Sequence, residues 1–209
     1  MSLTVDPAAA RTAGAAAGAP LLVLLHGYGS HEGDLLGLAP HLPAGLRLVA
    51  PRGPLTGGPG FAWAPVTTPG RPDPDAVRAA AAALHDWVGT VAEPGTPVAL
   101  LGFSQGGLLA TQLLRLAPDR FAAAVVLSGF SLDGTEPGDA VLAATRSLPV
   151  LFGHGDADRV IPADATARTS TWLAAHTAVE DREHPGLAHG IDAGVLADVR
   201  AFLTRTLPL

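Results

Sequence analysis

Short apolar runs alternate with segments of helical spacing along this 209-residue chain, and this alternation limits its fold more than any other feature. The runs are typical of buried strands, because they are almost wholly apolar and end at turn residues. They cover residues 21–25, 46–50, 98–103, 123–127 and 148–152, with a more exposed candidate at 179–184. The helical segments cover 35–42, from Asp73 or Asp75 to about Ala92, 105–116, 162–176 and 192–207. The alternation predicts an α/β fold, with a mostly parallel sheet and helices on both faces.

We expect a single domain, because the length is typical of one domain and neither a linker nor a repeat of fixed period divides the chain. Residues 8–20 are small and lack apolar periodicity. We therefore expect residues 1–20 to form a flexible leader and residues 21–209 to form the domain. Within the leader, Ser2–Val5 is a candidate for a short edge strand. Residues 52–72 are rich in glycine and proline and predict a long loop.

Composition excludes several classes of protein. Half of the chain is hydrophobic (48%) and only 15% is charged, which argues against disorder. The net charge of −6 and the lack of a basic cluster argue against nucleic acid as a partner. The chain has no cysteine, which excludes disulfides, a thiolate nucleophile and a cysteine-based zinc site. We expect a cytoplasmic protein without a membrane span, because no apolar stretch is long enough to cross a bilayer and the N-terminus lacks the pattern of a signal peptide.

One strand–helix junction carries the pentapeptide GFSQG at residues 102–106, which has the pattern G-x-S-x-G. A bare match is common, but here a buried strand leads into the serine and a helix leads away from it, as a nucleophile elbow requires. The first N–H groups of that helix favour negative charge at the site. Ser104 is therefore the candidate nucleophile, and the alternative is an ordinary glycine-rich turn with a capping serine.

A serine hydroxyl needs a base to accept its proton, and in proteins with this elbow the acid and the histidine follow the serine in that order. Asp158 lies just past the fifth strand in HGDADRVIP, 54 residues after Ser104. His189 lies 31 residues further on, in HPGLAHG. We expect His189 to accept the Ser104 proton and Asp158 to orient the imidazole.

Other residues compete for these two roles. Asp156 is the second candidate for the acid and otherwise has a role in structuring the loop. His184 is the second candidate for the base, but it lies nearer the strand and precedes a proline. His154 adjoins a glycine and can simply satisfy backbone groups. No histidine pair has the H-E-x-x-H spacing of zinc proteases, so we expect no metal.

Acyl transfer also needs an oxyanion hole, formed by the N–H of the residue after the nucleophile and an N–H from the loop after an earlier strand. The first donor is the Gln105 N–H. The segment HGYG at residues 26–29 ends the first strong strand, so the Tyr28 N–H is the second candidate. Two such donors are worth roughly 3–4 kcal/mol each to the transition state. The alternative for HGYG is a plain glycine turn.

The chain resembles the phospholipase/carboxylesterase family of α/β hydrolases, which includes acyl-protein thioesterases and small bacterial carboxylesterases. The resemblance extends from about Leu21 to Asp192 and rests on the segments LLHGYGSHEGDLLGLAPHL, APRGPLTGGPGFAWAP, LLGFSQGGLLATQLLRLAPDRFAAAVVLSGF, LFGHGDADRVIP and HPGLAHGID. It implies an α/β-hydrolase fold, no cofactor and a tendency to form homodimers. It also implies that the triad is Ser104, Asp158 and His189, and that the oxyanion donors are Tyr28 and Gln105.

The sequence departs from similar proteins at two places. Residues 64–65 after Trp63 are Ala-Pro, where an aromatic or acidic residue is common, and Arg159 stands where proline is frequent. Neither departure touches the triad, but the first can change the acyl pocket. Leu55, Phe61 and Trp63 in the long loop are candidate wall residues of that pocket, or else they anchor the loop on the core.

Together these features predict a cofactor-free serine hydrolase that cleaves carboxylic or thiol esters. The expected partner is a small acyl ester of short to medium chain length, such as a lysophospholipid, or an acylated protein. Two alternatives stay open. The same triad can serve acyl transfer, lyase or perhydrolase chemistry, because water exclusion and pocket shape decide the outcome. A binding protein that keeps the fold is the other alternative, although the complete Ser, Asp and His set argues against it.

Overall fold

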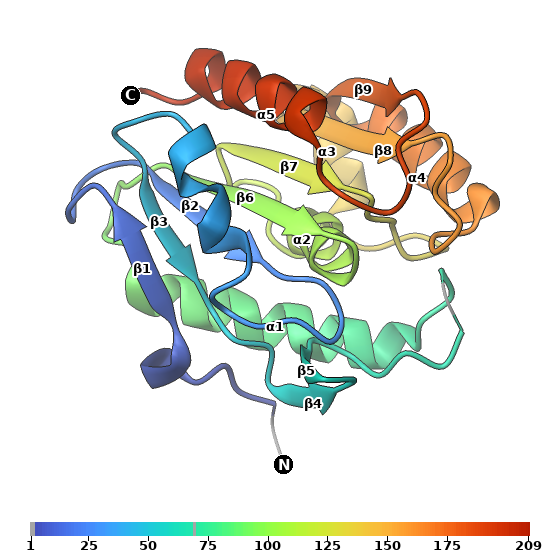
Figure 1. Ribbon diagram of the computed structural model, residues 1–209, viewed down its shortest axis with the longest axis horizontal. Coiled ribbons are helices and arrows are strands. Elements are labelled where there is room, and N and C mark those ends of the chain that lie inside the picture. Colours follow the sequence, from blue (N-terminus) through green and yellow to red (C-terminus); the bar gives the residue numbers. More distant parts are fainter. Residues whose placement is uncertain (1–2, 69) are drawn as a thin grey trace.

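A seven-stranded sheet runs through the computed structural model, and helices cover both of its faces (Figure 1). The structure describes residues 3–68 and 70–209, so Ser2 of the candidate edge strand and Pro69 of the predicted loop lie outside the described residues. In spatial order the strands are β1 (Arg11–Gly14), β3 (Arg47–Ala50), β2 (Leu21–Leu25), β6 (Val98–Phe103), β7 (Ala123–Leu127), β8 (Pro149–Gly155) and β9 (Ala178–His184). All pair in parallel except β1, which is antiparallel to β3.

The helices divide between the two faces of the sheet. Buried side chains of α1 (Pro74–Val91), α2 (Gln105–Leu116), the short α3 (Asp139–Thr145) and α4 (Ala163–His176) pack in one apolar cluster on the first face. The second face is covered by the 3-10 helix η2 (Leu35–His41) and by α5 (Ala193–Thr206). The predicted α/β class is confirmed, because a mostly parallel sheet lies between two helical layers.

Strand β2 shows why the apolar runs are continuous rather than alternating. Leu21, Val23 and Leu25 point into the cluster under α1 and α2. Leu22 and Leu24 point into the cluster under η2 and α5. Since successive side chains of a strand face opposite ways, a strand covered on both faces needs an apolar residue at every position.

The N-terminal segment differs from its prediction. Arg11–Gly14 forms the edge strand β1, with Arg11 opposite Ala50 and Gly14 opposite Arg47. A 3-10 turn, η1 (Pro7–Ala9), precedes it, and the described part of Ser2–Val5 forms no strand. Small residues suit this edge, because a Cβ at Gly14 would lie 2.3 Å from the carbonyl oxygen of Leu46. This part of the segment predicted as a flexible leader therefore belongs to the sheet.

Two further elements were not predicted. The glycine- and proline-rich loop holds a small hairpin, β4 (Leu55–Gly57) and β5 (Gly60–Ala62), and α3 lies between β7 and β8. The hairpin strands have three residues each, too few to show a period in the sequence. The segment predicted as a helix from residue 35 is a 3-10 helix with Pro40 inside it, which fits the missing N–H of proline.

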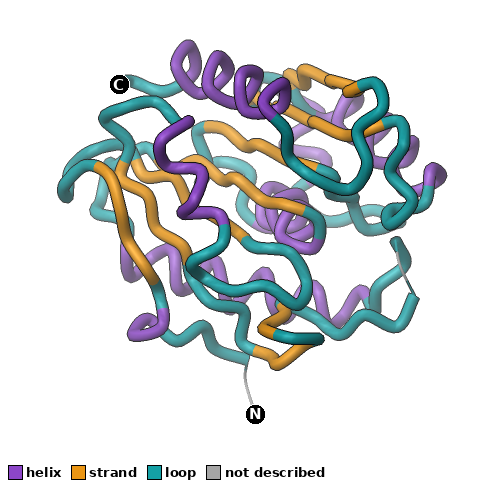
Figure 2. Tube along the Cα trace, in the orientation of Figure 1, coloured by secondary structure: helices purple, strands orange, loops and turns teal. Residues whose placement is uncertain are grey.

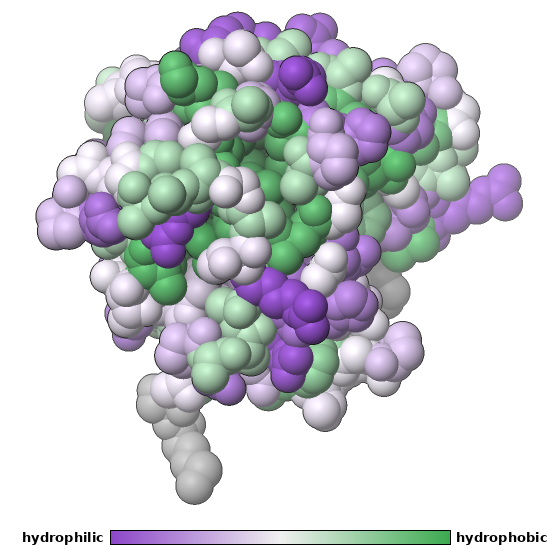
Figure 3. Space-filling view, turned by 60° about the vertical axis from the view of Figure 1, so that its left-hand side comes forward, coloured by the Kyte–Doolittle hydropathy of each residue, from purple (hydrophilic) through white to green (hydrophobic). Residues whose placement is uncertain are grey.

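The loops that follow β2, β6, β8 and β9 gather at the carboxyl end of the sheet (Figure 2). Ligand sites of open α/β sheets form at this end. Within the described residues, no helix combines the length and the apolar character that crossing a membrane requires. On the face drawn in Figure 3, polar and apolar residues are interspersed, and apolar residues gather in a hollow near its centre.

Candidate active site

Ser104 occupies a sharp turn between β6 and α2. Its backbone has φ 55° and ψ −114°, a conformation that residues other than glycine rarely adopt. The turn is held from both sides, because the Ser104 N–H donates to Leu127 O at 2.8 Å and its carbonyl accepts from Leu108 N at 3.1 Å. These neighbours on β7 and α2 stabilise the strained residue and fix the direction of its side chain.

The two glycines of the pentapeptide allow the backbone to pass close to neighbouring strands. A Cβ at Gly106 would lie 1.9 Å from Leu25 O, and one at Gly102 would lie 2.2 Å from Gly106 O. Both distances are far below van der Waals contact, so any side chain at either position would displace the turn. The G-x-S-x-G pattern is thus a packing requirement of this turn.

The structure brings together the three residues predicted as a triad. His189 Nε2 lies 3.0 Å from Ser104 Oγ, and His189 Nδ1 lies 2.7 Å from Asp158 Oδ2. Ser104 follows β6, Asp158 follows β8, and His189 lies between β9 and α5. Three loops separated along the chain therefore meet at the carboxyl end of the sheet.

Asp158 is held as a carboxylate. Its burial alone would raise the pKa, but hydrogen bonds from His189, from Ile161 N at 3.1 Å and from Val160 N at 2.8 Å outweigh burial and lower the pKa below its usual value. An ionised Asp158 can only accept, so Nδ1 of His189 carries the hydrogen and Nε2 is free to accept from the Ser104 hydroxyl.

Two backbone N–H groups beside Ser104 have no acceptor. Among the described residues, neither the Tyr28 N–H nor the Gln105 N–H donates to a protein atom. Gln105 is the first residue of α2, where N–H groups lack intrahelical partners. The loop with Tyr28 lies against the serine, since a Cβ at Gly27 would be 3.5 Å from Ser104 Cβ.

His26 holds the peptide that carries the Tyr28 N–H. The Gly53 N–H donates to Nε2 of His26 at 3.0 Å, so Nδ1 carries the hydrogen and donates to Gly27 O at 2.8 Å. Because the carbonyl and the N–H of a trans peptide point in opposite directions, this bond directs the Tyr28 N–H away from His26. Burial lowers the pKa of His26 more than the bond to Gly27 raises it, which favours the neutral ring that this arrangement needs.

An ion pair between the half-exposed Arg52 and the buried Glu32 fixes the other end of the same loop. Glu32 accepts from Arg52 at 2.7 and 2.6 Å and from Arg11 at 3.4 Å. The hydrogen bond from Arg52 lowers the pKa of Glu32 to about 2 and raises that of Arg52. The Arg52 guanidinium lies 4.4 Å from the centre of the Phe61 ring. Phe61 in turn bonds the loop through its backbone, since Gly29 N donates to Phe61 O and Phe61 N donates to Ser30 O, both at 2.8 Å.

A cavity of about 310 Å³ opens at Ser104. Its apolar wall includes Leu108, Phe130 and Ile161, which are buried. Three of the exposed large apolar residues of the chain lie around it: Tyr28 (46%), Val66 (45%) and Val160 (51%). The cavity is therefore an apolar pocket with the Ser104 hydroxyl beside it. Sequence reasoning did not place Leu108, Val66 or Phe130 here, nor Val160 and Ile161, which lie two and three residues after the predicted acid.

The predicted wall residues Leu55, Phe61 and Trp63 do not line this cavity, so that prediction is corrected. Trp63 is fully buried and its indole N–H donates to His26 O at 2.8 Å. Phe61 lies under Arg52, and Leu55 pairs with Ala62 in the hairpin. These side chains support the loops behind the site, whereas the pocket wall comes from segments nearer the triad.

The side chain of Gln105 also stabilises the loops around Ser104, which the G-x-S-x-G pattern did not predict. Its Oε1 accepts from Trp63 N at 2.9 Å and its Nε2 donates to Ala64 O at 2.7 Å. The residue that follows the nucleophile thereby ties the loop after β5 to the start of α2.

The competing residues lie apart from Ser104. Asp156 accepts from Gly186 N at 2.6 Å, in keeping with the loop-structuring role expected of it. His154 Nε2 lies 3.1 Å from Asp181 Oδ1, and His184 Nε2 lies 3.6 Å from Asp198 Oδ2. None of these side chains bonds Ser104. In the part of the chain that the structure describes, no three His, Asp or Glu side chains are grouped so as to hold a metal ion.

Comparison with known proteins gives one family. The profile of the phospholipase/carboxylesterase family matches residues 9–207. A carboxylesterase from Mesorhizobium loti has a similar structure, with a TM-score of 0.77, 26% identity and coverage of 88% of each chain. Esterase PE8 superposes with a TM-score of 0.75 at 29% identity, over 99% of this chain and 100% of that one.

The curated relatives are longer than this chain. The acyl-protein thioesterase 1 of Kluyveromyces lactis is 28% identical over 116 residues, which are 54% of this chain and 51% of that protein. In general the chain spans about half the length of the curated relatives it matches.

Proposed function

The chain belongs to the phospholipase/carboxylesterase family, and from this premise we propose that it is a serine hydrolase that cleaves carboxylic or thiol esters. The single observation that carries the proposal is the continuous path of two hydrogen bonds from Ser104 through His189 to Asp158. An esterase needs this path, because it makes a weak hydroxyl nucleophile reactive at neutral pH.

In the proposed mechanism, Ser104 Oγ attacks the carbonyl carbon of the ester while His189 Nε2 takes the hydroxyl proton. The carbonyl electrons move onto oxygen, and this oxyanion accepts hydrogen bonds from the Tyr28 and Gln105 N–H groups. The bond to the leaving oxygen or sulfur then breaks, and His189 returns its proton to the leaving group. Asp158 stabilises the imidazolium throughout.

A water molecule completes the cycle. His189 Nε2 takes a proton from the water as its oxygen attacks the acyl carbon, and the second intermediate collapses to release the carboxylic acid. The proton returns to Ser104 Oγ, so the protein regains its starting state. The acyl chain would lie against the buried wall of Leu108, Phe130 and Ile161, which suits a hydrocarbon chain.

Hydrolysis of p-nitrophenyl esters from acetate to palmitate tests the proposal. We expect Ser104→Ala to lower kcat by at least about 10³-fold, since loss of a triad nucleophile costs about 10⁶-fold in another serine hydrolase. Ser147→Ala is the matched control, because Ser147 is exposed and lies outside the cavity at Ser104. A fluorophosphonate should label the wild type and the control at one serine, and should not label Ser104→Ala. Equal turnover by wild type and Ser104→Ala would refute the mechanism.

The natural substrate class within this chemistry, a lysophospholipid or an acylated protein, stays a prediction that the chain-length series narrows. Homodimer formation and a cytoplasmic location are also proposals, and they rest on the family resemblance and the composition.

A further inference from the structure

The pocket beside Ser104 has a buried apolar floor and an exposed rim. The floor consists of buried apolar residues such as Leu108, Phe130 and Ile161. The rim carries Tyr28 and Val160, both about half exposed. Transfer of an acyl chain from water to an apolar surface lowers the free energy, so we expect the acyl chain to bind on the floor. The leaving group then lies at the rim, where it can depart into solvent.

The rim also carries a carboxylate, Asp34, which lines the same cavity. It follows residues 26–32, which carry the proposed oxyanion donor Tyr28 and are called the oxyanion loop here. Asp34 accepts a hydrogen bond at 2.5 Å from Oγ of Ser30, which also lines the cavity. Asp34 is exposed and caps no helix with its side chain, so it has no evident structural task beyond the bond to Ser30.

No cation balances this charge. The chain has no lysine, and the described lining of the cavity has no arginine. Arg11 and Arg52, which belong to the same loop network, both pair with Glu32. Across residues 3–68 and 70–209, Asp34 takes part in no ion pair. The acid of the triad differs in this respect, because Asp158 has three hydrogen-bond donors of its own.

We propose that Asp34 makes the site select esters and thioesters whose leaving group is neutral or cationic over those whose leaving group is anionic. This inference rests on the proposed function, since it concerns the leaving group of the same reaction. An anionic group beside Asp34 would be repelled by its charge, whereas an ammonium group there would be attracted to it. The substrate class that the site fits is thus an apolar acyl group joined to an uncharged or positively charged alcohol or thiol.

Three hexanoyl thioesters test the proposal with one acyl group and one readout. Their leaving thiols are 3-mercaptopropionate, N-acetylcysteamine and thiocholine, which carry charges of about −1, 0 and +1, and a disulfide dye detects each released thiol. The measured quantity is kcat/KM for the cationic substrate divided by kcat/KM for the anionic one. Comparing this ratio between proteins cancels the intrinsic reactivity of the substrates.

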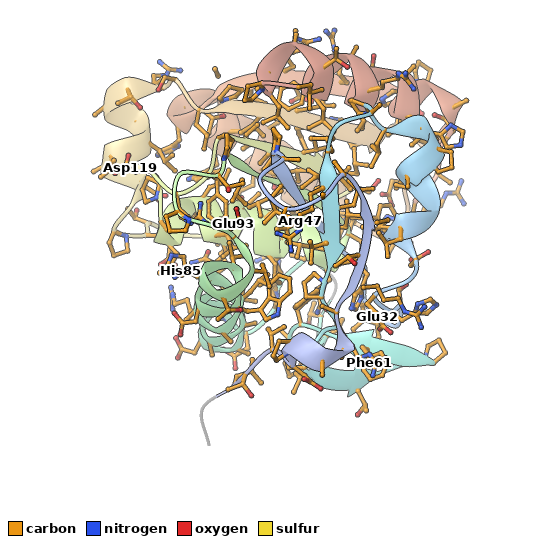
Figure 4. All side chains as sticks on the ribbon, turned by 90° about the vertical axis from the view of Figure 1, so that its left-hand side faces the viewer. Glu32, Arg47, Phe61, His85, Glu93 and Asp119 are labelled. Atoms are coloured by element: carbon orange, nitrogen blue, oxygen red, sulfur yellow. The ribbon has the colours of Figure 1, made fainter. Side chains whose placement is uncertain are left out.

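Asp34→Asn keeps the size of the side chain and an oxygen to accept from Ser30. Two unit charges about 8 Å apart at a dielectric constant of about 80 change a rate by about 2.4-fold. The effect counts once for the cationic and once for the anionic substrate, so the ratio should fall about sixfold in Asp34→Asn. Asp119→Asn is the control, because it changes the net charge by the same amount. Asp119 is exposed and lies in the turn before β7, at the amino end of the sheet, far from Glu32 and Phe61 in Figure 4. Its ratio should stay within about twofold of the wild type.

Salt gives a second measurement that needs no variant. Between about 0.01 M and 1 M salt the screening length falls from about 30 Å to about 3 Å, so the wild-type ratio should fall toward that of Asp34→Asn. An equal ratio in Asp34→Asn and Asp119→Asn, or a wild-type ratio that salt does not change, overturns the proposal while the hydrolase assignment stands. Hydrolysis of the neutral thioester that persists in Ser104→Ala, or no hydrolysis by the wild type, overturns the proposed function with it.

Discussion

Replacement of Glu32 by glutamine tests how the oxyanion loop is held in place. The Glu32 carboxylate is 4% exposed and accepts both hydrogen bonds of the Arg52 fork. Its pKa falls from an ordinary 4.5 to about 2, which corresponds to at most about 3 kcal/mol of folding free energy. Arg52 is 37% exposed, so solvent screening reduces the expected loss in Glu32→Gln to about 2 kcal/mol at pH 7.

The pH dependence of this loss is the sharper test. A carboxylate whose pKa is lowered by folding contributes its full stability above the unfolded value near 4.5, and the contribution is lost as pH falls toward 2. Urea unfolding at pH 7, 5, 4 and 3 should therefore show wild type and Glu32→Gln far apart at pH 7 and converging below pH 4.5. Glu93→Gln is the control, because Glu93 is exposed and lies away from Glu32 in Figure 4. It should differ from wild type by less than about 0.5 kcal/mol at every pH.

The same substitution should reach the active site. Arg52 lies over the Phe61 ring, and the Phe61 backbone bonds Gly29 and Ser30, the two residues that follow Tyr28. A loosened loop displaces the Tyr28 N–H, and since a whole oxyanion donor is worth 10²–10³-fold, we expect kcat to fall about tenfold with little change in KM. A stability difference that stays constant from pH 7 to pH 3 would refute the argument that the ionised pair is what holds the loop.

Two further substitutions test buried polar contacts at the two ends of α2. Gln105→Glu keeps the acceptor for Trp63 N but faces Ala64 O with an oxygen that cannot donate. Thermal and urea unfolding should therefore show that the free energy of unfolding falls by about 2 kcal/mol. An unchanged free energy of unfolding would contradict the assigned orientation of the amide. Arg115→Met removes the fully buried partner of Asp139 and should cost about 3–5 kcal/mol. Adding Asp139→Asn should recover part of that loss, and a double variant as unstable as Arg115→Met alone would show that the buried charge is not the cause.

The sequence was sufficient to locate the chemistry because each candidate residue follows a strand that is itself easy to find. Strands β2, β6 and β7 are wholly apolar runs, and their predicted bounds are close to or the same as those of the structure. Parallel strands place their carboxyl ends at one edge, so residues just past β2, β6 and β8 had to lie near one another. The prediction that Ser104, Asp158 and His189 meet followed from topology, and their catalytic roles await the serine substitution.

The pocket could not be predicted in the same way. Its wall combines Val66 from the loop after β5, Phe130 from the loop after β7 and Val160 from the loop after β8, and no local pattern relates these positions. Trp63 was a reasonable wall residue by its size and place in the loop. Its indole N–H instead donates to the carbonyl of His26. A buried tryptophan usually lies where its N–H has a hydrogen-bond acceptor.

Strand β1 and the β4–β5 hairpin, which sequence reasoning missed, share one task, and this explains why they left so little local signal. Strand β1 brings Arg11 to Glu32, and the hairpin brings Phe61 to Arg52 and to the oxyanion loop. Each strand is three or four residues long, which is too short to show a period in the sequence. Each is stabilised by its contacts with the loop that it supports. The position of the Tyr28 N–H thus depends on contacts between segments 20 or more residues apart in the chain. A motif can mark the donor, but only the folded network determines where the donor points.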